Sequence, residues 1–266
     1  MAAVEVVMGT SGALLEIEAL SCRFGGLEAV ANLGFSVRAG EIKAIIGPNG
    51  AGKTTLFNMI GGVIVPSAGR IRLGGNDIDR LPPYRRAQLG VIRTFQNLGI
   101  FSDMTVLENV MVGCHLRSHC GTLQALWRSP RSIAEEAVIR SKSFHLLERV
   151  GLVDRAQEAA AALSFGERKL LEMARALAAG PRLLMLDEPA AGVAHDAAVG
   201  IAAIIRELNR DGLTVLLVEH NMNMVMNISH SILVLDHGRK IADGTPSEVR
   251  KDPAVLAAYL GEGEDA

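Results

Sequence analysis

Short, uninterrupted runs of apolar residues recur along the chain, and segments with helical spacing separate them. Such runs are typical of strands covered on both faces, and their alternation with helices indicates a mainly parallel sheet. The predicted buried strands are residues 42–46, 91–95, 182–186, 214–218 and 232–235. The pattern therefore predicts an α/β fold with a mainly parallel sheet.

The chain begins with a different pattern. Residues 14–20 alternate apolar and charged side chains, which predicts a half-exposed strand. Its apolar side would carry Leu15, Ile17 and Ala19. A further strand is predicted at 33–37, and residues 240–242 are expected to form an edge hairpin with the strand at 232–235.

Between residues 97 and 163 helical periodicity replaces the strand pattern. Helices are predicted at 105–114 and 133–150. The second helix would carry one stripe of mostly apolar residues: Ile133, Ala137, Ser141, Phe144 and Leu147. We predict that 97–163 is a helical subdomain inserted into the sheet domain.

A long helix is predicted directly after this subdomain. Ser164 precedes Glu167 at the three-residue spacing of a capping box, in which each side chain bonds the backbone N–H of the other residue. The apolar face would comprise Leu170, Leu171, Ala174, Leu177 and Ala178. Gly180-Pro181 would end this helix, and a further helix is predicted over residues 195–210.

The segment GPNGAGKTT, residues 47–55, lies between the strand at 42–46 and a helix predicted over 54–61. It fits the phosphate-loop pattern G-x-x-x-x-G-K-[ST], in which glycines let backbone N–H groups approach a polyphosphate. The residues assigned to nucleotide binding are Gly47, Asn49, Gly50, Ala51, Gly52, Lys53, Thr54 and Thr55. Lys53 would reach the β- and γ-phosphates, and the Thr54 hydroxyl would ligate Mg²⁺. The chain is predicted to bind a nucleoside triphosphate.

Four polar residues follow predicted strands, at the sheet edge where α/β proteins bind ligands. Asp187 is a candidate for a second Mg²⁺ ligand beside Thr54, and Glu188 for the base that activates water. Gln96 would touch the metal or the water, and His220 the γ-phosphate. Each of these residues also has a structural interpretation when it is considered alone. An acidic pair can cap a helix, and Gln96 or His220 can make a structural hydrogen bond.

The composition of the chain narrows the functional classes to which it can belong. The formal net charge is −2, which does not favour nucleic acid as the main partner. Three cysteines without metal-like spacing suggest a reduced, cytosolic chain. No signal peptide or membrane span is expected. Residues 1–13 are predicted to be a flexible tail, 14–260 the nucleotide-binding domain and 261–266 an acidic tail.

Five motifs occur together and in a fixed order: GPNGAGKTT, TFQN, LSFGE, LLMLDEP and LLVEH. In this set the chain resembles the ATP-binding subunits of ABC transporters over about residues 14–260. The resemblance implies a phosphate-loop core with an N-terminal antiparallel β part and a helical subdomain. It also implies ATP and Mg²⁺ as cofactors and ATP hydrolysis coupled to transport.

The resemblance also implies roles for individual residues. Ser164 and Gly166 would contact the γ-phosphate bound to an opposite chain, so that two chains close head to tail around two ATP molecules. Phe24 matches the aromatic residue that stacks on adenine, although on its own it reads as a core residue. His220 matches the switch-loop histidine.

Two longer segments, TVLENVMVGCH and IADGTPSEVRKDPAVLAAYLGE, resemble the LivG type of branched-chain amino acid importer ATPase. That likeness implies membrane permease partners, a second ATPase chain (itself or a LivF-like one), and indirectly a solute-binding protein. It implies a location at the cytoplasmic face of the inner membrane. Two positions depart from the pattern of the wider family. Phe165 replaces a signature glycine, although LivG-like chains tolerate an aromatic residue there, and Ala194 replaces an Asp or Asn expected to bond across the dimer.

Other functions remain open on these residues. A LivG-like ATPase could serve urea, an amide or an aromatic acid, and an LptB-like lipopolysaccharide exporter ATPase is disfavoured by the long 97–163 segment. Non-transport ABC ATPases of DNA repair or translation carry coiled-coil or zinc insertions that this chain lacks. A kinase or GTPase would leave LSFGE and His220 unexplained, and a regulator that hydrolyses nothing is disfavoured by Glu188.

Overall fold

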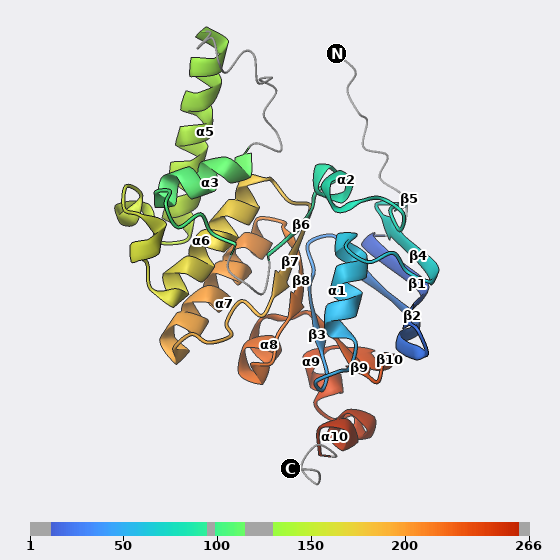
Figure 1. Ribbon diagram of the computed structural model, residues 1–266. Coiled ribbons are helices and arrows are strands. Elements are labelled where there is room, and N and C mark those ends of the chain that lie inside the picture. The colour runs from blue at the N-terminus through green and yellow to red at the C-terminus, as the bar shows by residue number, and fades with distance from the viewer. Residues whose placement is uncertain (1–11, 95–98, 115–129, 261–266) are drawn as a thin grey trace. The chain divides into compact units, whose positions relative to one another are not determined.

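The computed structural model describes residues 12–94, 99–114 and 130–260. The chain divides into two compact units (Figure 1). Unit 1 comprises residues 1–86, 212–218 and 229–266, and unit 2 comprises 87–211 and 219–228. Gln96, most of the 1–13 and 118–132 segments and the 261–266 tail lie outside the described residues. Within the described ranges, no helix has both the length and the apolar character needed to cross a membrane.

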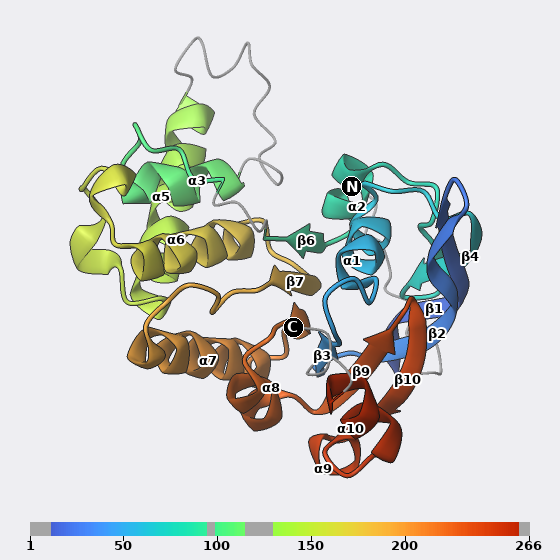
Figure 2. The same cartoon turned by 60° about the horizontal axis from the view of Figure 1, so that its bottom comes forward.

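Unit 1 contains an antiparallel sheet, seen with its two longest strands in Figure 2. Its strands are β1 (Ala13–Phe24), β2 (Leu27–Arg38), β4 (Ala68–Leu73) and β5 (Asn76–Asp77), in the order β2-β1-β4-β5. The fold expected from the family resemblance, with an antiparallel part near the N-terminus, is confirmed. Both first strands are longer than predicted, because Gly25 and Gly26 alone form the turn between them.

The predicted alternation in β1 fails at one position. Leu15 and Ile17 are buried, but Ala19 is exposed and Leu20 is buried in its place. The pairing with β2 shifts register between Ile17 and Leu20, and Ala19 has a φ of 48°. A β-bulge of this kind moves the following side chains to the other face of the strand, which alternation alone cannot reveal.

Unit 1 also contains three parallel strands, one of which leads into the phosphate loop. This strand, β3 (Ile42–Ile46), lies between β8 (Thr214–Val218) and β9 (Ser231–Asp236) and is parallel to both. Strand β10 (Arg239–Gly244) pairs antiparallel with β9, which confirms the predicted hairpin. All five residues of β3 and of β8 are buried, as their apolar runs predict.

The helix after the phosphate loop, α1 (Lys53–Gly61), is closed by a side chain that no motif predicts. Arg86, on α2 (Pro83–Gln88), is fully buried and donates to the carbonyl oxygens of Met59 and Ile60 at the end of α1. It also donates to Leu81 O and Asp79 O, each at 2.8 Å. Burial lowers the pKa of Arg86 to about 10. The arginine thus satisfies helix-end carbonyls that would otherwise be buried without partners.

Two short helices, α9 (Pro246–Val249) and α10 (Pro253–Leu260), close unit 1. Thr245 and Glu248 form a capping box at the start of α9. This cap and the proline at the first helical position define where α9 starts. Four residues are too few for a helical periodicity to define that start.

Unit 2 combines two parallel strands with most of the helices. Strand β6 (Val91–Arg93) pairs in parallel with β7 (Leu183–Asp187). The helices are α3 (Val106–Cys114), α5 (Pro130–Arg149), α6 (Phe165–Ala178), α7 (His195–Arg210) and α8 (Met222–Ile228), with short 3₁₀ turns at Val153–Arg155 and Ala160–Ala162. Helix α3 packs against α5 and α6 (Figure 1). The described part of the predicted helical subdomain lies within this unit.

The helix expected at 133–150 is present as α5, but its predicted stripe is not its buried face. Of that stripe only Leu147 is buried, and Ile133 is 57% exposed. The buried positions are Ser143, Leu146 and Leu147. The reason is that the first half of α5 extends beyond the helices that cover its second half (Figure 1).

The capping box predicted at Ser164 is confirmed: Ser164 caps α6, and the side chain of Glu167 returns the bond. The predicted apolar face is buried except for Leu170, which is half-buried. Helix α8 was not anticipated. Its signals are Asn221, whose Oδ1 accepts the Met224 N–H at 3.0 Å, and the buried Met224, Val225 and Ile228.

Candidate nucleotide-binding and catalytic site

The phosphate loop connects β3 to α1 in unit 1, and its glycines are required by the surrounding backbone. A Cβ on Gly47 would lie 2.0 Å from the carbonyl oxygen of Leu235, and one on Gly52 2.5 Å from that of Ala29. The φ angles of Gly47 and Gly52 are 150° and 95°, values that residues with a Cβ rarely adopt. The loop therefore follows a tight path that requires glycine at these two positions.

The loop offers donors and positive charge. Lys53 is 7% exposed, and its Nζ donates to Gly47 O at 2.6 Å and to Pro48 O at 2.7 Å. The first N–H groups of α1 have no partners inside the helix, and its first turn holds no acidic residue. Asn49, Gly50 and Thr54 are exposed, whereas Ala51 is buried and Thr55 is half-buried. A helix start of this composition fits a polyphosphate.

Phe24 is the last residue of β1, opposite Leu27 in the hairpin. Its side chain is 50% exposed, so interpreting it as a core residue is wrong. An exposed ring of this kind is able to stack on a base.

Asp187 and Glu188 stand at the end of β7 in unit 2. Asp187 is 4% exposed, and its Oδ2 lies 2.7 Å from Nη2 of Arg93 on β6. Its backbone N–H donates to the Thr94 hydroxyl at 3.3 Å. The ion pair with Arg93 compensates the buried negative charge of Asp187. The motif did not predict this partner.

The structure brings Glu188 and His220 together. Oε1 of Glu188 lies 3.2 Å from Nε2 of His220. Glu188 has a φ of 50°, a left-handed conformation that costs a residue with a side chain about 1–3 kcal/mol. This conformation turns the carboxylate out of line with the buried strand and toward the histidine.

Glu219 is the residue of this site that the motifs did not single out. It is 2% exposed, and its carboxylate accepts the N–H groups of Ala190 at 2.8 Å, His220 at 2.8 Å and Asn221 at 3.0 Å. One buried carboxylate therefore joins the loop after Glu188 to the loop that carries His220. The available signal was its place at the end of the buried strand 214–218, which matches the place of Asp187 after β7.

Ser164 and Gly166 lie at the start of α6. Ser164 is exposed; its hydroxyl accepts the Glu167 N–H, and its own N–H donates to Glu167 Oε2 at 2.8 Å. Hydrogen bonds from the side chain and backbone of Ser164 lower the pKa of Glu167, with a smaller contribution from Arg155. A Cβ on Gly166 would meet Ala197 Cβ only at 3.6 Å, so this glycine is not required by packing within the chain.

The residues expected to hold Mg²⁺ do not form a complete ligand cluster in the part of the chain that the structure describes. Among the described residues, no three His, Cys, Asp or Glu side chains gather as they would around a metal ion. Thr54 belongs to unit 1 and Asp187 to unit 2, while Gln96 is outside the described ranges. One hydroxyl and one carboxylate fit Mg²⁺ when phosphate oxygens and water complete its shell.

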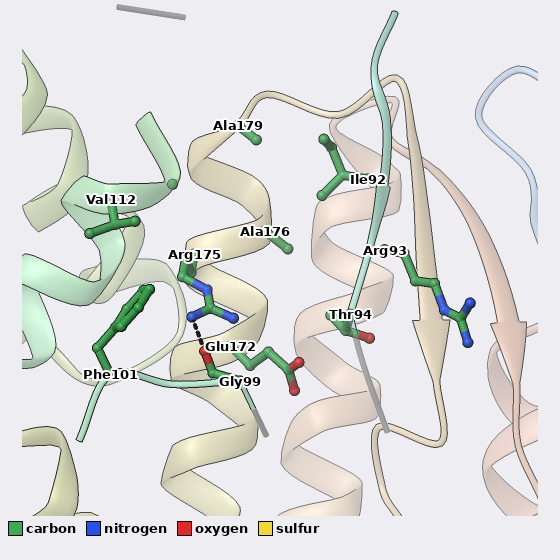
Figure 3. Close-up of a pocket in the computed structure, with 11 residues that line it drawn as sticks. Ile92, Arg93, Thr94, Gly99, Phe101, Val112, Glu172, Arg175, Ala176 and Ala179 are labelled. Carbon is green, nitrogen blue, oxygen red and sulfur yellow. Dashed lines mark hydrogen bonds between the residues drawn. The ribbon is translucent and has the colours of Figure 1, made fainter. Parts of the chain in front are cut away.

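Unit 2 also contains an open cavity of about 550 Å³ between β6, α3 and α6 (Figure 3). Phe101 and Val112 line one side of it, and Ile92 and Ala176 the other. Arg175 crosses it, donating to Gly99 O with its guanidinium 5.7 Å from the Phe101 ring centroid. The cavity is thus mainly apolar, but Arg93, Glu172 and Arg175 also line it, and it begins next to Thr94, two residues before Gln96.

Comparison with known proteins gives consistent results. The ABC transporter family profile matches residues 30–191, and that of the branched-chain amino acid ATP-binding cassette transporters matches 239–265. The chain is 42% identical over 250 residues to the branched-chain amino acid transport protein BraF of Pseudomonas aeruginosa, covering 94% of this chain and 98% of that one. It is 42% identical over 252 residues to LivG of Escherichia coli K12, with the same coverage. The structure of an ATP-binding cassette in its ADP conformation superposes with a TM-score of 0.82 at 34% identity, covering 94% and 99% of the two chains.

Proposed function

Since this chain belongs to the ABC transporter family of ATP-binding proteins and is an ATPase of that family, we propose that it powers an importer for branched-chain amino acids. Hydrolysis would drive alternating access in membrane permease partners. The observation that carries the chemistry is the 3.2 Å contact between Glu188 and His220, in a chain whose phosphate loop is complete.

In this proposal the site residues divide the binding and the chemistry between them. The backbone N–H groups of residues 47–55 and the Lys53 ammonium bind the phosphates, and Phe24 stacks on the adenine. Glu188 accepts a proton from the attacking water, and His220 contacts the γ-phosphate and orients Glu188. Gln96 would contact the metal or the water.

Mg²⁺ would be held by the Thr54 hydroxyl and the Asp187 carboxylate, with Gln96 as a further contact. When bound it supplies charge neutralisation of the phosphate oxygens. The pair with Arg93 fixes the direction of the Asp187 carboxylate, which a metal ligand requires.

We place the permease contact on the cavity of Figure 3. A largely apolar groove that is also lined by two arginines and one glutamate fits a short amphipathic helix carrying an acidic or carbonyl acceptor. The cavity is built from the described part of 97–163 and from α6, so that it joins the segment after Gln96 to the helix capped by Ser164.

The remaining partners follow from the same family. A second ATPase chain, either a copy of this one or a LivF-like chain, would supply Ser164 and Gly166 to the other nucleotide. A solute-binding protein would act indirectly through the permeases. The chain would be held at the cytoplasmic face of the inner membrane by its permease partners and would take no nucleic acid partner.

The named relatives favour a branched-chain amino acid as the solute, because BraF and LivG are named for that transport. A LivG-like system for urea, an amide or an aromatic acid is the alternative. No residue of the ATPase contacts the solute in either case, so the choice requires the whole transporter.

The deciding experiment is uptake of labelled leucine, urea and benzoate by proteoliposomes that contain the chain with its permeases and binding protein. Leucine uptake that depends on ATP supports the proposal, and uptake of only another solute contradicts the substrate. Lys53→Ala should remove ATP hydrolysis and uptake, because it removes transition-state charge stabilisation without disturbing the core. Lys251→Ala, at an exposed lysine after α9, is the matched control and should change neither.

The docking surface is tested in the same proteoliposomes. Val112→Glu places a carboxylate at the half-exposed edge of the cavity. It should leave the ATPase activity of the isolated subunit intact and remove leucine uptake. Normal uptake by this variant would place the permease elsewhere.

A further inference from the structure

Two residues, Phe165 and Lys169, connect the start of α6 to the backbone of Glu188 within one chain. Lys169 is 7% exposed, and its Nζ donates to the Glu188 carbonyl oxygen at 3.2 Å. The same ammonium lies 5.8 Å from the centroid of the Phe165 ring. Lys169 therefore stands between the turn that follows Ser164 and the residue assigned as the base.

Phe165 contacts the loop after Glu188 as well. A Cβ built on Gly192 would lie 3.1 Å from Cε1 of this ring, so the ring packs directly on the glycine backbone. Glu188 has a φ of 50°, a left-handed conformation that a residue with a side chain keeps only with support from its surroundings, whereas Gly192, with a φ of 75°, adopts such a conformation readily. The family glycine at position 165 would provide neither the ring contact with Lys169 nor the packing on Gly192.

The two contacts act on one element. A cation over an aromatic face is attracted to it, and a charge-assisted bond to a carbonyl is stronger than a neutral one. A shift of the first turn of α6 would move Phe165 and Lys169 together and change both supports of the Glu188 loop. Because the Glu188 carboxylate is directed by this backbone, its contact with His220 would change with it.

We propose that Lys169 is a positioning residue for Glu188, and that Phe165 and Lys169 transmit the state of the first turn of α6 to the base of the same chain. This rests on the proposed head-to-tail association, in which that turn faces the ATP held by the other chain. Occupancy of one nucleotide site would then set the activity of the other.

The positioning role is tested by steady-state ATPase kinetics of the full chain. Lys169→Met keeps the length of the side chain and removes the ammonium. It should lower kcat roughly tenfold, because the base is misplaced, while KM for ATP stays within about twofold. Lys169→Arg should recover most of kcat. The matched control is Lys142→Met, which removes a lysine bond to the other end of α6, from Nζ to Ala178 O at 3.0 Å, and should leave kcat unchanged.

Thermal unfolding of the same variants separates positioning from stability. Equal losses of melting temperature for Lys169→Met and Lys142→Met, with kcat lowered only in the first, support the proposal. If kcat of Lys169→Met equals the wild-type value, or if Lys169→Arg restores stability but not kcat, the positioning role is overturned.

The coupling role is tested by the dependence of rate on ATP concentration. Phe165→Leu should lower the Hill coefficient for ATP, and in the Lys169→Met background it should cause no further change, since both act through one contact. Additive effects, or an unchanged Hill coefficient, would overturn the coupling. Wild-type protein that hydrolyses no ATP even with its permeases would overturn the proposed function, and this inference with it.

Discussion

At the scale of single residues, the site depends on backbone positions as much as on catalytic side chains. Glu188 and His220 are 3.2 Å apart although they come from loops that follow different strands. Glu219 makes this possible, because its buried carboxylate accepts N–H groups from both loops. A carboxylate with three such bonds and 2% exposure is a positioning element rather than a surface charge.

Glu219→Gln tests this role. The amide keeps the shape, but its NH₂ group cannot accept an N–H, so at least one of the three bonds is lost. We expect kcat for ATP hydrolysis to fall roughly ten- to a hundredfold, since a small displacement of a base has effects of that size. KM should be unchanged because Lys53 and its loop are untouched. Glu207→Gln, on the exposed side of α7, is the control; if both variants keep wild-type kcat, Glu219 has no positioning role.

Glu167 provides a second test at this scale, through pH. Its pKa is lowered by the bonds with Ser164, so the folded protein binds fewer protons there than the unfolded chain does. The stability that Glu167 contributes is therefore present above its unfolded pKa, near 4.3, and is lost as pH falls through the folded pKa. In urea titrations between about pH 3 and pH 6, Glu167→Gln should show a weaker loss of unfolding free energy on acidification. Parallel pH curves for variant and wild type would contradict this.

At the scale of elements, the helix starts differ in quality. Helices α6 and α9 begin with complete capping boxes, whereas α7 begins at Ala194, which has no side-chain bond to offer. Alanine is a poor N-cap because the first N–H groups of the helix are left to water. The departure from the family at this position therefore weakens a helix start as well as removing a side chain expected to bond across the dimer.

Ala194→Asp should stabilise the protein by about 0.5–2 kcal/mol, the range known for N-cap substitutions. The expected result is a higher urea midpoint with an unchanged m-value. Ala194→Leu, which cannot cap, serves as the control and should not raise the midpoint. If the aspartate variant gains no stability, the start of α7 is already satisfied in another way.

At the scale of the whole molecule, the proposed function requires association. The two nucleotides would each be held between one chain's phosphate loop and the other chain's first turn of α6. In the chain itself, Gly166 has ordinary van der Waals distances around its Cβ position, so an external contact is a consistent explanation for a glycine there.

Glu188→Gln should convert a transient ATP-dependent association into a lasting one. Glutamine cannot accept the proton of the attacking water, so hydrolysis slows by ~10²–10⁴-fold while the phosphate loop still binds ATP. Bound ATP then stabilises the closed dimer by mass action. Light scattering after gel filtration should show dimers with ATP and monomers with ADP, for this chain alone or with a LivF-like partner. A variant that binds ATP but stays monomeric under every condition contradicts the head-to-tail arrangement.

The sequence by itself determined the features that depend on local spacing. The glycines and lysine of residues 47–55, the Ser164–Glu167 cap and the apolar runs of β3, β7 and β8 are each recognisable within a few residues. These patterns can be recognised from neighbouring residues alone, although the layers that cover a strand and the backbone that crowds Gly47 and Gly52 come from elsewhere in the chain.

Only the tertiary structure decided the features that depend on distant neighbours. The bulge at Ala19 is seen only against β2, and the buried face of α5 only against the helices that cover half of it. The bond from Lys169 to Glu188 and the bonds of Glu219 join segments about 20 to 30 residues apart, since Lys169 reaches position 188 and Glu219 reaches position 190. No periodicity encodes such pairs, because the backbone geometry that brings them together is a property of the packed unit and not of either segment.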